Sequence, residues 1–473
     1  LISSTKNADG TRTDYWKMDQ PHAPYLFMLT VGEFAVVEEK WEDIPVSYYV
    51  EPEFESSAKD IFGHTPEMLS FFSEKLGLKY PWPKYAQVVV RDYVSGAMEN
   101  TSAVIFGEFV QKESRELIDN HNDKIVAHEM FHHWFGDYVT CESWANLVLN
   151  EGFANYSEYL WKEHKYGKDR ADQHRLTEIQ GYLYQASSDI HPLVDFSYES
   201  KEDMFDQHSY NKGGLVLHML RHLVGDQAFR ASLYTYLQNN AYQSVEVHDL
   251  RLAFEKTTGL DLNWFFDQWY FSSGHPALQI DYTYSPSEVT VDIAQIQDVS
   301  MMPSIFILPT EVELYYEDGS VERVNIEIDQ RNQSFTIPVD RPVVAAVVDP
   351  DRILLSVFVE RRSDEEYVHL YNDCAALEIR LESIDFLGKN NTKGAEEVIV
   401  SALSDPFWSV RATALEYFDP ITDERKQLLA RMAAGDPHSA VRVNAINKVA
   451  EFEDPESVDI ISKGINQTDA YPV

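Results

Sequence analysis

Cysteine is scarce in this chain of 473 residues, which contains only Cys141 and Cys374, far apart in sequence. Two cysteines are too few for a disulfide framework, so the fold must depend on packed interiors. Long hydrophobic runs are also missing, because no stretch approaches the roughly eighteen apolar residues that a membrane-spanning helix needs. These absences exclude a disulfide-stapled module and predict that no segment spans a membrane.

Positive charge is scarce as well. The chain has 39 lysines and arginines against 78 aspartates and glutamates, which gives a formal net charge of −39. A field of this sign repels phosphate backbones and anionic lipid headgroups. The composition therefore argues against nucleic acid as a partner, and the sequence leaves the cellular compartment open.

The hydrophobic pattern divides the chain into regions. A hydrophobic fraction of 44% is enough for packed cores, and the length predicts about three domains. Residues 1–45 show strand-like alternation around Tyr25 to Val37. Residues 46–275 are mostly helical, residues 276–362 consist of short alternating strands that suit a small β-sandwich, and residues 363–473 are helical again.

The last hundred residues contain an internal repeat. Three short segments recur 31 positions further on: Asp405-Pro406, Val410-Arg411 and Ala414 return as Asp436-Pro437, Val441-Arg442 and Ala445. Aspartate as the expected N-cap and proline at the first helical position are typical of stacked helical hairpins, and the period resembles HEAT repeats. Residues 469–473 resemble the opening of another repeat, so we expect the natural chain to continue. Such stacked helices offer a surface to a protein partner.

A pair of histidines lies four residues apart in His128-Glu129-Met130-Phe131-His132. The surrounding apolar spacing predicts one helix, with its N-cap at residues 122–123 and its end at Gly136. Histidines four apart project from the same helix face, so both imidazoles can reach one metal ion. Glu129 lies about one position round, beside the open site of that metal, whereas His133 points elsewhere.

Glu151 is the expected third ligand, eighteen residues after His132 within Asn150-Glu151-Gly152-Phe153-Ala154. Catalytic zinc sites use three protein ligands and keep a fourth position for water. The five-residue histidine pattern alone also occurs on surface helices, and the position of Glu151 is what favours metal binding. The sequence therefore predicts one zinc ion on His128, His132 and Glu151.

The segment Gly96-Ala97-Met98-Glu99-Asn100 precedes the histidine pair and follows a strand expected at the edge of a sheet, residues 87–90. A glycine-led turn beside an edge strand lets backbone groups approach a substrate closely. Glu99 would place a carboxylate where a free α-ammonium needs a partner. Taken alone, the segment is more typical of a surface loop with a solvated glutamate.

Together these residues resemble the aminopeptidase N family of gluzincin zinc peptidases. The segment 96–100 is similar to its exopeptidase motif, and His128 to His132 with Glu151 are similar to its zinc motif. Further similar stretches lie within the first 360 residues: Pro24-Tyr25-Leu26, Val31-Gly32-Glu33-Phe34, residues 80–85, Val139-Thr140 and Trp144.

The resemblance implies a multidomain α+β fold. Its expected parts are the end of an N-terminal β-domain (1–45), a thermolysin-like zinc peptidase domain (46–275), the β-sandwich (276–362) and a truncated HEAT-like α-solenoid (363–473). Most of the family's N-terminal domain, which supplies a second contact to the substrate amine, would then lie outside this chain.

The resemblance also implies a role for each site residue. Tyr210, in Tyr210-Asn211-Lys212-Gly213, is similar to the tyrosine that stabilises the oxyanion. Glu129 would take a proton from the zinc-activated water, Glu99 would bind the free N-terminus, and Met98 would line the first side-chain pocket. The implied activity is release of N-terminal amino acids from peptides that have a free N-terminus.

Two other functions use related folds. A non-catalytic scaffold is disfavoured because such relatives lose the zinc and base residues, all of which are present here. An epoxide hydrolase is disfavoured because that branch lacks the β-sandwich expected at 276–362 and uses an arginine and a lysine with no counterpart found here.

Overall fold

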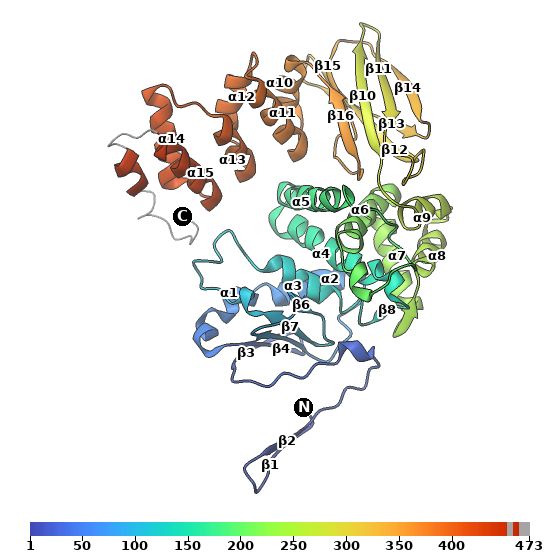
Figure 1. The fold of residues 1–473 in the computed structure, drawn as a ribbon, viewed down its shortest axis with the longest axis vertical. Coiled ribbons are helices and arrows are strands. Elements are labelled where there is room, and N and C mark those ends of the chain that lie inside the picture. Colours follow the sequence, from blue (N-terminus) through green and yellow to red (C-terminus); the bar gives the residue numbers. More distant parts are fainter. Residues whose placement is uncertain (452–456, 463–473) are drawn as a thin grey trace.

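The computed structural model describes residues 1–451 and 457–462, so the expected repeat opening at 469–473 lies outside the described residues. Mixed sheet and helix come first, then two facing sheets, then a set of C-terminal helices (Figure 1). This arrangement is the multidomain α+β architecture that the sequence predicts. No helix within residues 1–451 and 457–462 is long and apolar enough to cross a bilayer.

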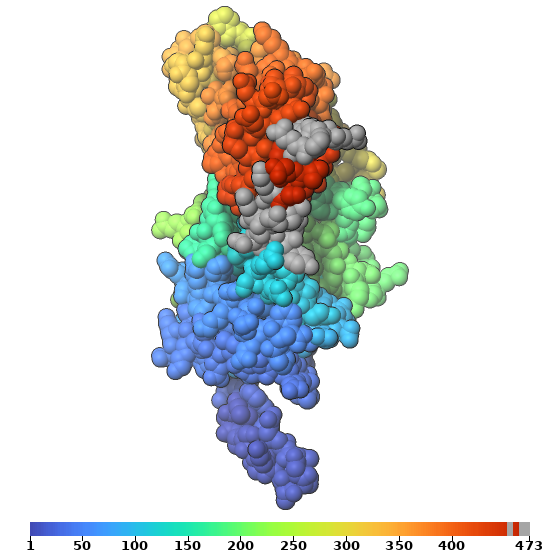
Figure 2. Space-filling model, turned by 90° about the vertical axis from the view of Figure 1, so that its left-hand side faces the viewer, coloured from blue at the N-terminus to red at the C-terminus, as the bar shows by residue number. Residues whose placement is uncertain are grey.

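The first residues form a hairpin of β1 (Ser3–Lys6) and β2 (Arg12–Tyr15), which projects from the rest of the molecule (Figure 2). The prediction of a strand from Tyr25 to Val37 is wrong for residues 25–34. A short 3-10 turn, η1 (Pro24–Leu26), is followed by extended chain whose Leu29 and Val31 are 80% and 89% exposed. These apolar residues alternate, but in the described structure no strand pairs with them.

A five-stranded sheet forms the base of the next region. Its order is β3 (Ala35–Trp41), β4 (Ile44–Val50), β5 (Tyr85–Val90), β7 (Ala103–Gly107) and β6 (Ala97–Met98). Because β3 pairs with β4 along its whole length, this sheet begins before the boundary expected at residue 46. The strand expected at an edge, β5, lies between β4 and β7 instead, and the two edge strands are β3 and β6.

Helices cover this sheet and extend from it (Figure 1). The first are α1 (Ala58–Phe62), α2 (Thr65–Leu76) and α3 (Asp123–Phe131), followed by α4 (Val148–Tyr166), which is buried from Val148 to Trp161. The remaining elements are β8 (Val139–Cys141), α5 (Lys168–Ala186), the π-helical turn η6 (His208–Lys212), α6 (Gly213–Val224), α7 (Asp226–Asn239), β9 (Gln243–Val245), α8 (Val247–Thr258) and α9 (Asn263–Trp269). Four 3-10 turns complete the region: η2 (Pro52–Ser57), η3 (Glu108–Val110), η4 (Trp144–Asn146) and η5 (Lys201–Met204).

Two glycines let α4 and the start of α6, which directly follows η6, approach each other closely. A Cβ atom on Gly152 would lie 3.1 Å from the Cα of Gly213, and one on Gly213 would lie 2.9 Å from the Cα of Gly152. Any larger residue would force the two backbones apart. Since Glu151 precedes one glycine and Tyr210 lies three residues before the other, this contact brings both residues to one place.

Two facing sheets follow, as the alternating pattern of residues 276–362 predicts (Figure 1). In β11, Val289, Val291 and Ile293 face the interior while the residues between them are more exposed. One sheet contains β14 (Asn332–Pro338), β11 (Glu288–Gln295), β10 (Ala277–Tyr284) and β16 (Val357–Arg361), and the other contains β13 (Val321–Ile328), β12 (Leu308–Tyr316) and β15 (Val343–Val348).

The C-terminal helices have a hydrophobic core of their own. They are α10 (Asp364–Asp373), α11 (Leu377–Asn390), α12 (Ala395–Ala402), α13 (Trp408–Tyr417), α14 (Asp423–Gly435) and α15 (Ser439–Ala450). They curve back toward the loop before α3 (Figure 1), where the Ser439 amide donates to Asp119 Oδ2 at 2.8 Å.

The predicted repeat has matching contacts in both copies. Arg411 donates to the carbonyl of Asp405 at 2.9 Å, and Arg442 donates to the carbonyl of Asp436 at 2.6 Å. The expected capping is wrong, because the helices begin at Trp408 and Ser439 rather than beside the aspartates. Each aspartate instead accepts from the amide two residues later, in a turn that precedes the helix.

Candidate metal centre and active site

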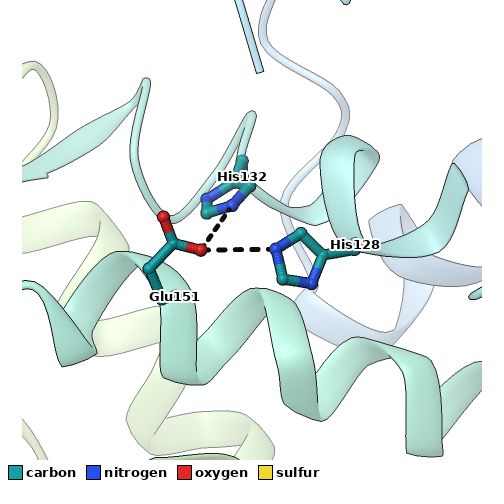
Figure 3. Close-up of side chains that lie close together, drawn as sticks. All are labelled: His128, His132 and Glu151. Atoms are coloured by element: carbon teal, nitrogen blue, oxygen red, sulfur yellow. Dashed lines mark hydrogen bonds and ion pairs between the residues drawn. The ribbon is translucent and has the colours of Figure 1, made fainter. Parts of the chain in front are cut away.

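The three expected metal ligands meet at one point. His128 lies in α3, His132 follows the end of that helix with helical backbone angles, and Glu151 projects from α4 (Figure 3). The Nε2 atoms of both histidines lie 3.3 Å from the same oxygen, Oε2 of Glu151. All three side chains are buried. The four-residue spacing therefore does bring both imidazoles to one site.

The other nitrogen of each imidazole is held by an acceptor. His128 Nδ1 lies 2.9 Å from Oε1 of Glu158, and His132 Nδ1 lies 3.0 Å from the carbonyl oxygen of Phe135. Such contacts place the ring proton on Nδ1 and direct the Nε2 lone pair toward a metal. Sequence reasoning missed Glu158. Its position could have indicated this role, because it lies seven residues, or about two helical turns, after Glu151 on the same helix.

The donor set fits a zinc ion. Two imidazole nitrogens and one carboxylate oxygen are ligands typical of catalytic zinc. A separation of 3.3 Å between donors matches the edge of a tetrahedron with zinc–ligand bonds of about 2.0–2.1 Å. With the ring protons on Nδ1, three lone pairs would face one another, and a bound cation would satisfy all of them.

The charges around the ligands favour a cation. Burial raises the pKa of Glu151, but the two imidazoles outweigh it and lower that pKa to about 2. Burial lowers the pKa of His128, but its bonds to Glu151 and Glu158 raise that pKa to about 9. Both shifts mean that the surrounding carboxylates stabilise positive charge at this point, where a metal ion would compete with protons.

Glu129 lies beside the ligand group without belonging to it. Ligand atoms of Glu99, Glu129 and His132 lie within 4.8 Å of one another. Oε2 of Glu129 is buried and has no hydrogen-bond partner in the described structure. Burial, opposed by the imidazoles and supported by Glu99 and Glu151, raises the pKa of Glu129 to about 8. A carboxylate of this kind can accept and return a proton near neutral pH.

Tyr210 lies against one of the ligand histidines. Its ring stacks on the His128 ring with centroids 5.8 Å apart and planes 10° apart. Burial, with the charges of Glu151 and Glu99, raises its pKa well above the usual range, so the phenol keeps its proton as a hydrogen-bond donor.

A cavity of about 1290 Å³ connects these residues. Gly96, Ala97, Met98 and Glu99 line it, and β6 is one of the two edge strands of the five-stranded sheet. Asn100 is not among the lining residues. Its side chain donates to the carbonyl of Leu26 at 3.3 Å and so fastens the η1 segment.

The same segment adds Tyr25 to the cavity wall, a residue that sequence reasoning gave no part in the site. Its hydroxyl accepts a hydrogen bond from the side chain of Asn150 at 3.2 Å, and its ring packs edge-on against Trp144. No local pattern marks such a residue, because its place depends on contacts with residues more than a hundred positions away.

Comparison with known proteins agrees with this geometry. Residues 61–269 match the profile described as the peptidase family M1 domain. Residues 61–269 belong to peptidase family M1. The M1 domain therefore contains every side chain of the ligand group, together with Glu99, Glu129 and Tyr210, and it ends before the two facing sheets.

Curated relatives align with more than half of this chain. The chain is 31% identical over 262 residues to Aminopeptidase M1 of Arabidopsis thaliana, covering 54% of this chain and 30% of that protein. It is 30% identical over 281 residues to Glutamyl aminopeptidase of Bos taurus, covering 57% of this chain and 29% of that protein. The alignments thus span less than a third of the length of these relatives.

A solved structure resembles the chain beyond the M1 domain. The crystal structure of Legionella pneumophila aminopeptidase A in complex with aspartic acid matches 99% of this chain and 59% of its own, with a TM-score of 0.75. The sequence identity is 19%, so this likeness shows a shared fold. It extends over the facing sheets and the C-terminal helices.

Proposed function

We propose that this chain carries the active site of a zinc-dependent aminopeptidase, which releases the N-terminal residue of a peptide. One observation supports this most strongly: a single cavity contains the ligand group, the unpaired carboxylate of Glu129 and the buried carboxylate of Glu99. Membership of family M1 agrees with the proposal. A thermolysin-like catalytic domain over residues 46–275 is part of it.

His128, His132 and Glu151 would hold the zinc ion. The chemistry that zinc supplies when bound is polarisation of the scissile carbonyl and acidification of a water molecule. Glu129 takes the proton of that water and passes it to the leaving amine. Tyr210 donates a hydrogen bond to the oxyanion that develops on the substrate.

Glu99 would select for a free N-terminus. An endopeptidase and an exopeptidase can share a zinc site, so an exopeptidase needs a group that recognises the chain end. The α-ammonium is a charge at a fixed distance from the first peptide bond. A buried carboxylate beside Glu129, next to the free edge of β6, can pair with it while the backbone of β6 aligns the peptide.

The metal proposal predicts zinc content directly. The purified protein should contain about one zinc ion per molecule, and a double variant with His132→Ala and Glu151→Ala should contain almost none, because only one of the three ligands remains. Elemental analysis after dialysis measures this, with circular dichroism as a check on folding. A well-folded double variant that keeps stoichiometric zinc would show that the ligand assignment is wrong.

The activity is tested with a panel of aminoacyl fluorogenic amides, without chelator, with chelator and after addition of zinc. We expect hydrolysis that chelation abolishes and zinc restores. An epoxide substrate assayed in parallel tests the epoxide hydrolase alternative. Absence of turnover on both the amides and the epoxide would favour a non-catalytic scaffold. These assays need the full-length protein, because the chain covers only part of its relatives.

Replacing Glu99 by alanine should lower kcat/KM by about 10²-fold for peptides with a free N-terminus. A substrate ammonium would then be buried without its partner, at a cost of roughly 3 kcal/mol. N-acetylated peptides have no ammonium, so they should be poor substrates of the parent and no worse for Glu99→Ala. We would measure both substrates on both proteins. If the preference for free termini is as large in the variant, Glu99 does not bind the amine.

A further inference from the structure

A second cluster of titratable side chains lies outside the ligand group. Atoms of His191, Asp206 and His208 come within 4.8 Å of one another. Nε2 of His191 lies 2.9 Å and Nδ1 of His208 lies 2.7 Å from Oδ2 of Asp206. These distances are shorter than the 3.3 Å between donors in the ligand group, and they are hydrogen-bond distances. Hydrogen bonds, and not a shared metal ion, therefore hold the three side chains of the cluster together.

Asp206 caps the turn that carries Tyr210. Its Oδ1 atom accepts from the amides of His208 at 3.0 Å and Ser209 at 3.1 Å. Its backbone carbonyl accepts from the amide of Tyr210 itself at 3.1 Å. The position of the catalytic phenol therefore depends on how firmly this one aspartate is held.

Helix α5 also holds this turn. The side-chain amide of Gln185 donates to Oδ2 of Asp206 at 2.6 Å, and its oxygen accepts from the amide of Gln207 at 2.8 Å. In the same turn, the side chain of Asn211 donates to the carbonyl of Glu178, also in α5, at 3.0 Å. Within this frame, Oδ2 of Asp206 is the point at which Gln185, His191 and His208 all converge.

The contacts of His191 require two ring protons. Nδ1 lies 2.8 Å from the carbonyl oxygen of Pro192, and Nε2 lies 2.9 Å from the Asp206 carboxylate. Both partners are acceptors only, so both ring nitrogens must donate and the ring is an imidazolium. His208 differs, because its Nδ1 donates to Asp206 while its buried Nε2 has no partner in the described structure. His208 is therefore neutral.

The other basic groups around the cluster are neutral or only partly charged near neutral pH. Burial lowers the pKa of Lys212, in the same turn, to about 7, and that of His275, which contacts Tyr182 of α5, to about 4. Asp189 is the further charge that acts on His191. Because His191 contacts the Asp206 carboxylate directly, its imidazolium is the main counter-charge of Asp206.

We propose that His191, Asp206 and His208 form a positioning cluster that holds Tyr210 in the active site, and that it does so while His191 is protonated. This inference rests on the proposed function of Tyr210. Burial lowers the pKa of His191, but its bonds to Asp206 and Pro192 outweigh burial and raise it. The stabilisation that the His191–Asp206 pair gives to the turn is therefore complete below the ordinary pKa of histidine. It is lost as pH rises through the raised pKa of His191.

Two substitutions test the cluster. Asp206→Asn removes the charge, and His191→Gln removes the imidazolium. Each should lower kcat by about 10- to 100-fold, through misplacement of the phenol, with KM and zinc content almost unchanged. Asp195→Asn is the matched control, because this aspartate caps Ser197 in the same connecting segment and should leave kcat unchanged.

A double-mutant cycle separates positioning from general damage. In a Tyr210→Phe background, Asp206→Asn should have almost no further effect on kcat, because the group that the cluster positions is already gone. The kcat of the parent should also fall at alkaline pH, and His191→Gln should abolish this dependence. The proposal would be overturned if the losses in kcat multiply in the double variant. It would also be overturned if the kcat of His191→Gln still falls at alkaline pH.

A measurement without turnover distinguishes failure of this inference from failure of the proposed function. Imidazole NMR on the full chain, with His191→Gln for assignment, should show His191 titrating above the ordinary value in the parent and lower in Asp206→Asn. A 3-fluorotyrosine placed at position 210 should give one ¹⁹F signal that changes as His191 loses its proton. If ¹⁹F and His191 signals titrate independently, the cluster does not position Tyr210, whether or not the protein is a peptidase.

Discussion

Glu129→Gln is expected to lower kcat by about 10³- to 10⁴-fold while the protein keeps its zinc and its fold. Glutamine has nearly the same shape but cannot accept and return a proton. Glu129 lies next to the ligand group and bonds to no other side chain through its buried Oε2 atom, so the substitution leaves the three ligands in place.

Single-turnover kinetics with zinc analysis on the same preparation measure this effect. Glu142→Gln is a suitable control, because Glu142 is exposed on the segment that joins the two ligand-bearing helices. A Glu129→Gln variant with full zinc and unchanged kcat would remove Glu129 from the mechanism. A variant that loses zinc would instead show that Glu129 contributes to metal binding.

Tyr210→Phe is expected to lower kcat by about 10²- to 10³-fold with a small change in KM. The phenol donates its hydrogen bond to charge that exists only in the transition state, so its loss affects turnover more than binding. The ring that stacks on His128 is kept in phenylalanine, and the ligand geometry should therefore survive.

The kcat and KM of Tyr210→Phe for one good substrate decide this prediction, with Tyr25→Phe as a comparison within the same cavity. Tyr25 contacts Asn150 and Trp144 rather than the ligand histidines, so its loss should act on substrate binding and alter KM. If Tyr210→Phe raises KM and leaves kcat intact, the phenol binds the ground state and does not stabilise the oxyanion.

Local periodicity was enough to predict that His128 and His132 point toward one place. His128 and His132 share a helical face because four residues make about one turn, and this holds in almost any helix. Glu151 lies on another helix, so its spacing from His132, like the segment around Glu99, was informative through its resemblance to the motifs of a known family. The alternation of residues 276–362 likewise predicted strands, since each strand must bury one face.

Predictions that depend on which strands pair with one another were less reliable. Tyr25 to Val37 alternates like a strand, yet no strand of the described structure pairs with residues 27–34, whereas Glu38 and Glu39 pair within β3 despite their charge. Residues 87–90 were recognised as a strand but placed at an edge. Which strands are neighbours is decided by contacts between distant segments, and these leave no local signal.

The sequence by itself was enough to predict which residues carry the chemistry, because two histidines four apart share a helix face and the other site residues lie in short motifs that resemble those of a known family. Only the tertiary structure decided how those residues are held. Glu158 orients His128 from the facing helix, the close contact of Gly152 and Gly213 brings Tyr210 to Glu151, and Asp206 joins His191 to the turn that carries Tyr210. Each of these contacts joins elements that are separate along the chain, so their packing in three dimensions had to be known first.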